Sequence, residues 1–190
     1  MAVEFALDAD TALMLKVAKD DGPSFDLLLS RHRTTVVNHL YRLVHNRDIA
    51  EELAQDVFVR VYRSRAKYQP DAKFTTWLFR ITTNVALNWR RDTRHESAHV
   101  PLDPSQLLDR VPRADELLLR QHRAKQVRAA VDKLPQKQQV AVLMHKYEGM
   151  EYSEIAEAMR CTIPALKSLL FRAYETLRHR LAHFAPGRVA

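Results

Sequence analysis

Glycine and cysteine are scarce in this chain of 190 residues, which has three glycines and a single cysteine, Cys161. Strand-rich folds use glycine in turns and bulges, so the shortage favours helices. One cysteine excludes an intramolecular disulfide and a zinc site built from several thiolates, and it is typical of a reducing compartment. We expect Cys161 to be a small buried side chain rather than a redox or metal-binding group.

Long apolar runs are also missing, because no uninterrupted stretch approaches the ~20 residues that a membrane span needs. The N-terminal sequence MAVEFALDAD is acidic and has no basic segment followed by an apolar one, which argues against a secretory signal. Hydrophobic residues make up 46% and charged residues 28%, the proportions of a folded chain. We therefore expect a soluble, cytoplasmic protein with one ordinary domain or two small ones.

Acidic residues are outnumbered by basic ones, 23 against 30, which gives a net charge of +7 and favours an anionic partner such as nucleic acid. The surplus is concentrated between Arg60 and Arg94, where nine lysines and arginines accompany two aspartates. The preceding stretch from Val44 to Val59 is acidic, with four carboxylates and one arginine. Opposite signs in neighbouring stretches predict two partners, although solvated helix faces remain the alternative.

Apolar residues recur at spacings of three and four along most of the chain, which predicts an all-α fold. Gly22-Pro23 is expected to separate the first two helices, and Asp48 to cap the third. The expected helices of the N-terminal half span residues 10–20, 24–45, 48–63 and about 75–91.

The helical pattern dissolves after Asp92, where prolines and polar residues predict a linker, with a further helix beginning within residues 114–124. In the C-terminal half, one helix is expected to open at Leu134-Pro135 and to end at Gly149. Two others are expected to be capped by Ser153 and Thr162.

A short helix, a tight turn and a longer second helix are typical of a helix-turn-helix. The second helix of such a motif fits the major groove of DNA. Here it would present Lys167, Ser168 and Arg172, which are donors suited to phosphates and base edges. A plain helical hairpin can imitate this pattern.

The basic stretch from residue 73 to residue 91 is interleaved with aromatic residues, as in proteins that bind single-stranded nucleic acid. Trp77 shares an apolar face with Ile81 and is expected in the core, whereas Phe74 stands in a polar turn and is less easily assigned there. Asn84 and Asn88 lie four residues apart, so they can read a base edge together or face water.

Two segments resemble regions 2 and 4 of bacterial sigma factors of the extracytoplasmic-function (ECF) group, in the sigma-70 family. The first comprises DIAEELAQDVFVRVY (residues 48–62) and FTTWLFRITTNVALNWRR (residues 74–91). The second comprises LPQKQQ (residues 134–139) and YEGMEYSEIA (residues 147–156). The resemblance runs from about residue 24 to residue 182, except for the linker.

The resemblance implies a subunit that binds core RNA polymerase and directs promoter recognition and DNA opening, with no enzymatic activity, cofactor or metal. Core polymerase would be bound by Glu51, Glu52, Gln55 and Asp56. The −10 element would be bound by Lys73, Phe74, Arg80, Asn84, Asn88, Arg90 and Arg91. The −35 element would be bound by Ser153, Lys167, Ser168 and Arg172. Members of this family are commonly held inactive by an anti-sigma factor, which is an expected partner.

The implied architecture is two small helical domains joined by a flexible linker. The expected division is residues 1–94 for region 2, 95–122 for the linker, 123–185 for region 4 and 186–190 for a tail. One departure concerns the recognition helix, where family members commonly have Gly-Thr-Val-Lys-Ser-Arg. This chain has Pro-Ala-Leu-Lys-Ser-Leu, so Leu169 replaces an arginine and removes a contact to a phosphate or base.

Three alternatives remain at this point. A stand-alone helix-turn-helix regulator would leave residues 48–94 unexplained. A metal-dependent nuclease is suggested by the histidine pairs His95/His99 and His179/His183, but no HExxH motif accompanies them. An adaptor protein without transcriptional activity is the third.

Overall fold

The structure, a computed structural model, describes residues 8–93 and 114–182. Within these ranges all regular elements are helical, which confirms the expected all-α class. The N-terminal half contains α1 (Ala9–Val17), α2 (Gly22–Val44), α3 (Arg47–Arg63) and α4 (Phe74–Asp92), with a short 3₁₀ turn at Arg65–Lys67. The C-terminal half contains α5 (Ala114–Asp132), α6 (Gln136–Tyr147), α7 (Tyr152–Ala158) and α8 (Ile163–Arg180).

The starts of the N-terminal helices follow ordinary capping chemistry. Asp8 Oδ1 accepts hydrogen bonds from the backbone N–H groups of Asp10 and Thr11 at 3.0 and 2.8 Å, which fixes the first turn of α1. The expected cap of α3 is wrong by two residues, because Asn46 Oδ1 accepts from Ile49 N at 3.0 Å and Asp48 lies inside the first turn. The Asp48 carboxylate still stabilises α3, because it lies near the positive, N-terminal end of the helix dipole.

Gly22-Pro23 does not separate α1 from α2 as expected. Asp21 caps α2, and the proline stands in the first turn, where its missing N–H leaves no hydrogen bond unmade. The α2 helix ends at His45, whose φ of 57° places it in the left-handed region. The break between the two helices therefore comprises residues 18–21, before Gly22.

In the C-terminal half, two of the expected boundaries are confirmed and one is wrong. Gly149, with φ of 62°, follows the end of α6, and Thr162 Oγ1 accepts from Ala165 N at 3.3 Å at the start of α8. Ser153 does not cap α7, because the cap residue is Glu151, whose backbone N–H is held by Glu154 Oε2 at 2.8 Å. In this capping box the carboxylate of Glu151 takes the role that the sequence suggested for Ser153, and the carboxylate of Glu154 supplies the reciprocal hydrogen bond.

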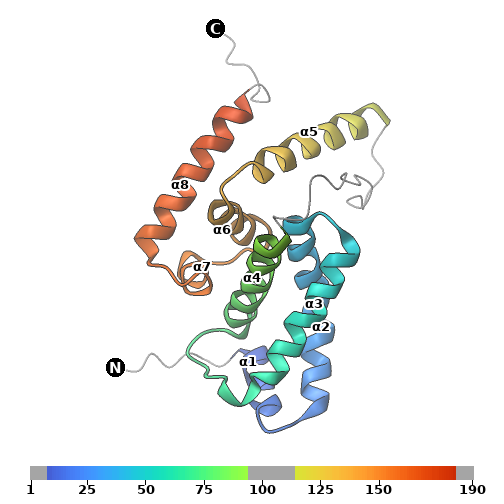
Figure 1. Cartoon of the computed structure of the whole chain (residues 1–190), viewed down its shortest axis with the longest axis vertical. Coiled ribbons are helices and arrows are strands. Elements are labelled where there is room, and N and C mark those ends of the chain that lie inside the picture. The colour runs from blue at the N-terminus through green and yellow to red at the C-terminus, as the bar shows by residue number, and fades with distance from the viewer. Residues whose placement is uncertain (1–7, 94–113, 183–190) are drawn as a thin grey trace.

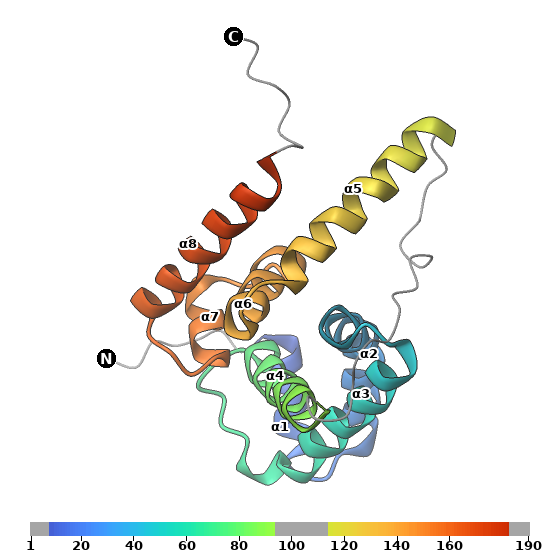
Figure 2. The same cartoon turned by 45° about the horizontal axis from the view of Figure 1, so that its top comes forward.

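The two halves pack directly against each other. The α4 helix lies beside α7 at the centre of the molecule, and α2 contacts α6 (Figure 1). Buried side chains of both halves form one continuous hydrophobic cluster, which includes Leu78 of α4 and Ile155 of α7. The α5 helix extends outwards from this region and packs mainly against α8 (Figure 2).

The expected linker coincides largely with residues 94–113, which lie outside the described residues. Its C-terminal end does not, because α5 begins at Ala114 and continues without a break through residue 122. None of the helices in the described ranges is long and apolar enough to cross a membrane.

Candidate nucleic-acid and protein interfaces

The acidic residues expected to meet a protein partner lie together on α3. Glu52 and Gln55 are exposed, whereas Glu51 and Asp56 are engaged by arginines one helical turn away. Glu51 Oε1 accepts from Arg47 Nε at 2.9 Å, and Asp56 accepts from Arg60 Nε at 3.0 Å through both oxygens. These surface pairs are weak, so both carboxylates remain available to a stronger basic partner.

An apolar groove of about 400 Å³ runs between α2 and α3, beside the acidic residues. Glu51 and Gln55 line its rim. Its walls are formed by Phe25, Leu29, Ala54, Phe58, Val59 and Tyr62. Val59 and Tyr62 keep 44% and 38% of their surface exposed, which is unusual for neighbouring large apolar side chains on one face. Sequence analysis missed this groove because its apolar residues fit an ordinary core pattern.

A basic pocket of about 350 Å³ lies where the end of α3 meets α4. Asn84 and Ile81 contribute from α4. The remaining lining residues are Arg60, Arg63, Ser64 and Lys67. Of these residues, only Asn84 was expected in a binding site. The sequence did signal the others, because the basic surplus begins at Arg60.

The other residues expected to bind single-stranded DNA do not all lie on one surface. Asn88 and Arg91 are exposed on α4, and Arg80 is half-buried. Lys73 Nζ lies 2.7 Å from Glu154 Oε1, and this hydrogen bond raises the pKa of the ammonium group. Lys73 therefore contacts the other half of the chain in this structure.

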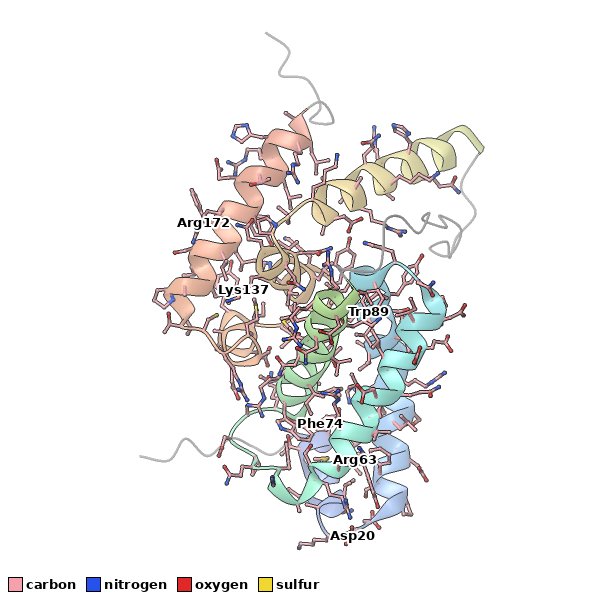
Figure 3. All side chains as sticks on the ribbon, viewed as in Figure 1. Asp20, Arg63, Phe74, Trp89, Lys137 and Arg172 are labelled. Carbon is pink, nitrogen blue, oxygen red and sulfur yellow. The ribbon has the colours of Figure 1, made fainter. Side chains whose placement is uncertain are left out.

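The prediction that Phe74 stacks on a DNA base is wrong, because its side chain is completely buried. Its ring contacts the rings of His32, Tyr68 and Trp77, and its backbone N–H donates to Thr11 Oγ1 at 3.1 Å. Thr11 of α1 and His32 of α2 therefore contact Phe74 from two sides of the bundle, and Figure 3 labels this residue at the start of α4. The half-buried Trp77 packs against the core, as expected.

The expected recognition residues are brought together on α8. Lys167, Ser168 and Arg172 are exposed and share one surface with Phe171. Arg172 lies on the side of α8 that faces away from α4 (Figure 3). Phe171 keeps 68% of its surface exposed, the largest fraction among the exposed large apolar side chains described here. Sequence analysis did not nominate it.

Ser153 is exposed on α7, the first helix of the motif. Leu169 is half-buried, whereas Leu166 and Leu170 of the same helix are buried in the core. Leu169 thus stands at the border of the core and does not supply a polar contact. The departure from the family pattern is therefore a change from a charged donor to an apolar side chain.

The described parts of the chain contain no cluster of side chains suited to metal binding or redox chemistry. No group of three or more potential metal ligands is found among these residues. His95, His99 and His183 lie outside the described ranges, so the two expected histidine pairs are not placed. Cys161 is partly buried, and burial raises the pKa of its thiol, which keeps it in the unreactive protonated form.

Comparisons with known proteins match both halves of the chain. The family described as sigma-70 region 2 matches residues 28–96, and the family described as sigma-70, region 4, matches residues 124–177. The ECF RNA polymerase sigma-E factor of Haemophilus influenzae is 30% identical over 181 residues, covering 90% of this chain and 95% of that protein.

Solved structures agree on the fold. The chain is similar to CnrH in complex with the cytosolic domain of CnrY, with a TM-score of 0.70 and 21% identity, over 93% of this chain and 99% of that one. It is also similar to the sigma factor RpoE in complex with the anti-sigma factor NepR from Bartonella quintana, with a TM-score of 0.65 and 20% identity, over 83% and 96% of the two chains.

Proposed function

Since this chain belongs to the ECF sigma factors of the sigma-70 family, we propose that it binds core RNA polymerase and directs it to the promoters of a specific set of genes. The observation that carries this proposal is the presence of two separate DNA-facing surfaces on one chain. One is the basic pocket around Asn84, and the other is the exposed face of α8 around Lys167 and Arg172. A stand-alone regulator needs only the second surface.

The basic pocket supports recognition of the single-stranded −10 element. Arg60, Arg63 and Lys67 supply positive charge for the backbone, and Asn84 supplies an amide that can pair with the edge of a base. A pocket of about 350 Å³ is large enough for one flipped base, whose unstacking costs a few kcal/mol. Asn88 and Arg91 extend this surface along α4. Phe74 takes no part, because it belongs to the core.

The exposed face of α8 supports recognition of the −35 duplex. Lys167 and Arg172 can donate to phosphates or guanine edges, and Ser168 can contact either base type. Phe171 adds an apolar surface that suits the methyl group of thymine in the major groove. This contact offers affinity at a site where Leu169 has removed a charged donor. Ser153 on α7 remains a proposed contact to the backbone.

The face of α3 supports docking on core polymerase. Glu52 forms no ion pair within the described residues and Gln55 is an exposed amide, while Glu51 and Asp56 have only weak surface pairs. The apolar groove beside them can receive side chains of the partner, and the acidic rim would steer a basic surface towards it. Charged rim and apolar centre together match the usual anatomy of a protein interface.

The remaining features of the proposal follow from the family. We propose that the chain has no catalytic activity of its own, uses no cofactor, and acts in the cytoplasm where core polymerase is found. We retain residues 1–94 and 123–185 as its two functional domains, joined by residues 95–122 and followed by residues 186–190. Control by an anti-sigma factor is also proposed, since RpoE, a protein of the same fold, was solved with one.

The deciding experiment is binding of the purified full chain to bacterial core RNA polymerase, followed by run-off transcription from a promoter library. We expect binding and promoter-dependent transcripts. Asn84→Ala should leave core binding unchanged and reduce promoter opening, because the side chain is exposed and only the base contact is lost. Tight specific binding to duplex DNA without any binding to core polymerase would overturn the proposal in favour of the stand-alone regulator.

A further inference from the structure

The hydroxyl group of Thr11, in α1, joins three separate parts of the N-terminal half. The residue is only 3% exposed, and its Oγ1 atom donates to Asp8 Oδ2 at 2.9 Å. The same atom accepts from Phe74 N at 3.1 Å and, more weakly, from Tyr68 Oη at 3.4 Å. A hydroxyl has one donor and two acceptor sites, so the hydrogen-bonding capacity of this buried side chain is fully used.

The bond from Phe74 replaces a cap that α4 lacks. The first N–H groups of a helix have no partner within the helix, and the side chain of the N-cap residue usually accepts from one of them. Lys73, the N-cap residue of α4, makes no such hydrogen bond, and a lysine side chain has no acceptor atom for one. The Thr11 hydroxyl accepts here instead, so a residue of α1 fixes the start of α4.

A second contact fastens the other end of the connection between α3 and α4. Arg65 donates from Nε and Nη2 to Asp20 Oδ1 at 2.8 and 2.6 Å, in the turn after α1. Its guanidinium carbon also lies 4.2 Å from the centroid of the Tyr62 ring. Asp20 lies at the same end of the molecule as Arg63 and Phe74 (Figure 3). An exposed pair of this kind adds little stability, so its main effect is to orient the arginine.

Between these two contacts the connection packs on the core. Tyr68 is 7% exposed, and its ring centroid lies 5.0 Å from that of Trp77 and 6.4 Å from that of Phe74. Burial raises the pKa of the Tyr68 hydroxyl, which therefore stays protonated and able to donate to Thr11. The chain between α3 and α4 is thus held from α1 and its following turn at Arg65, Tyr68 and Phe74.

This connection contributes to the basic pocket that we assign to the −10 element. Lys67, which lines the pocket, lies between the fastened residues Arg65 and Tyr68. Asn84 contributes from α4, the helix whose start is fixed by Thr11. A binding group is precise only when the residues around it hold it in place. The separation of Lys67 from Asn84 therefore depends on contacts outside the pocket.

We propose that Thr11 and Asp20 are positioning residues for promoter opening, because they hold residues 64–73 in the shape that accepts a flipped base. Neither residue lines the pocket. The effect on DNA rests on the proposed function, whereas the anchoring rests on the contacts above. A connection that is ordered before binding loses little conformational entropy when the base enters. Loss of an anchor should thus weaken recognition of the base without removing any group that contacts it.

The first test measures whether Thr11 holds the connection. Thr11→Val keeps the shape of the side chain and leaves the Phe74 N–H without its acceptor. Hydrogen–deuterium exchange of the full chain should become about tenfold faster in peptides covering residues 65–76, and it should not change in peptides from α6 to α8. Thr11→Ser, which keeps the hydroxyl, is the matched control and should exchange as wild type does. Unchanged exchange over residues 65–76 in Thr11→Val would refute the anchoring.

The second test measures recognition of the −10 strand by the full chain bound to core polymerase. The probe is a single-stranded oligonucleotide with the −10 sequence of a promoter found by run-off transcription, compared with a scrambled oligonucleotide of the same composition. Thr11→Val should lower the ratio of the two affinities about tenfold, and Thr11→Ser should restore it. A merely structural defect reduces the amount of folded protein and leaves this ratio unchanged. An unchanged ratio in Thr11→Val would therefore overturn the positioning role.

If Thr11→Val does not fold, Asp20→Ala decides the question, because the Asp20 side chain is 70% exposed and its loss leaves the core intact. The matched control is Asp26→Ala, which removes the same charge from an exposed position of α2. We expect Asp20→Ala to lower the affinity ratio roughly threefold and Asp26→Ala to leave it unchanged. Equal ratios in these two variants would overturn the role of Asp20. Failure of the wild-type chain to bind core polymerase or to open any promoter would instead refute the proposed function, while the exchange result would stand independently.

Discussion

Phe74 offers the sharpest distinction between a core residue and a DNA contact. Its side chain is fully buried and contacts the rings of His32, Tyr68 and Trp77 at centroid distances of 5.4, 6.4 and 6.1 Å. Truncation of such a phenylalanine to alanine costs about 3–5 kcal/mol, through lost burial and the cavity left behind. We therefore expect Phe74→Ala to lower the free energy of unfolding by that amount.

The assay is urea unfolding followed by far-ultraviolet circular dichroism. With a slope of about 1–3 kcal/mol per molar urea, the midpoint should fall by more than about 1 M. Phe171→Ala is the matched control, because the same truncation at a side chain that is 68% exposed should change stability by less than about 0.5 kcal/mol. It should instead weaken binding to a −35 duplex. Normal stability of Phe74→Ala together with loss of promoter opening would refute the reasoning.

Three further predictions concern single charges. Asp56→Arg should weaken binding to core polymerase, measured by titration of labelled core, because it places a cation against a basic surface; unchanged affinity would show that this face of α3 is not the docking site. Lys167→Ala should reduce the affinity for −35 duplex DNA and lower the salt slope by about one, whereas an unchanged slope would mean that no phosphate contact is lost. Burial would raise the pKa of Asp10, but hydrogen bonds from Arg31 and His32 outweigh it and hold the pKa below its ordinary value of 3.8. The stabilisation from ionised Asp10 is thus present above pH 3.8 and is lost as the pH falls through the lowered pKa. The urea midpoint of unfolding should therefore differ between wild type and Asp10→Asn by a constant amount from pH 5 to 7, and this difference should shrink in stronger acid.

The helices were predictable from the sequence because their apolar spacing is strong and local. The α3 helix, expected over residues 48–63, spans Arg47–Arg63, and α8 begins at the expected cap, Thr162. The errors arose where two capping residues stand close together. Asn46 and Asp48 are equally good caps by type, and only the backbone at Asn46, which is extended, decides between them.

The position of Phe74 could not be predicted from its neighbours in the sequence. Its turn is polar, so the local pattern indicates exposure. Thr11 of α1, which lies 63 residues earlier in the chain, accepts a hydrogen bond from its backbone and helps to enclose it. Conversely, the exposed Phe171 interrupts the polar face of α8 without a change of period. Burial in both cases depends on contacts between elements, which periodicity does not report.

The basic pocket was predictable in part, because charge composition marks Arg60 as the start of a basic stretch but does not show which residues converge. Arg63 and Lys67 meet Asn84 only because α3 ends and the chain turns back into α4. The shared face of the acidic residues on α3 was easier to predict, because residues at i and i+4 of a helix lie on one face whatever the tertiary structure. Single-helix surfaces are therefore predictable from sequence, whereas a pocket between helices requires the fold.

The interdomain contacts lay beyond sequence reasoning for a different reason. His39 lies among apolar residues of α2, a pattern that predicts an ordinary core residue. Its partner Glu148 lies 109 residues away, and no spacing rule links the two. Neither residue is unusual alone. The buried His39 Nδ1 and Glu148 Oε1 atoms lie 3.2 Å apart, and they can satisfy each other in this way only when the two halves pack. The pair therefore stabilises the arrangement in which the two halves of the chain pack against each other.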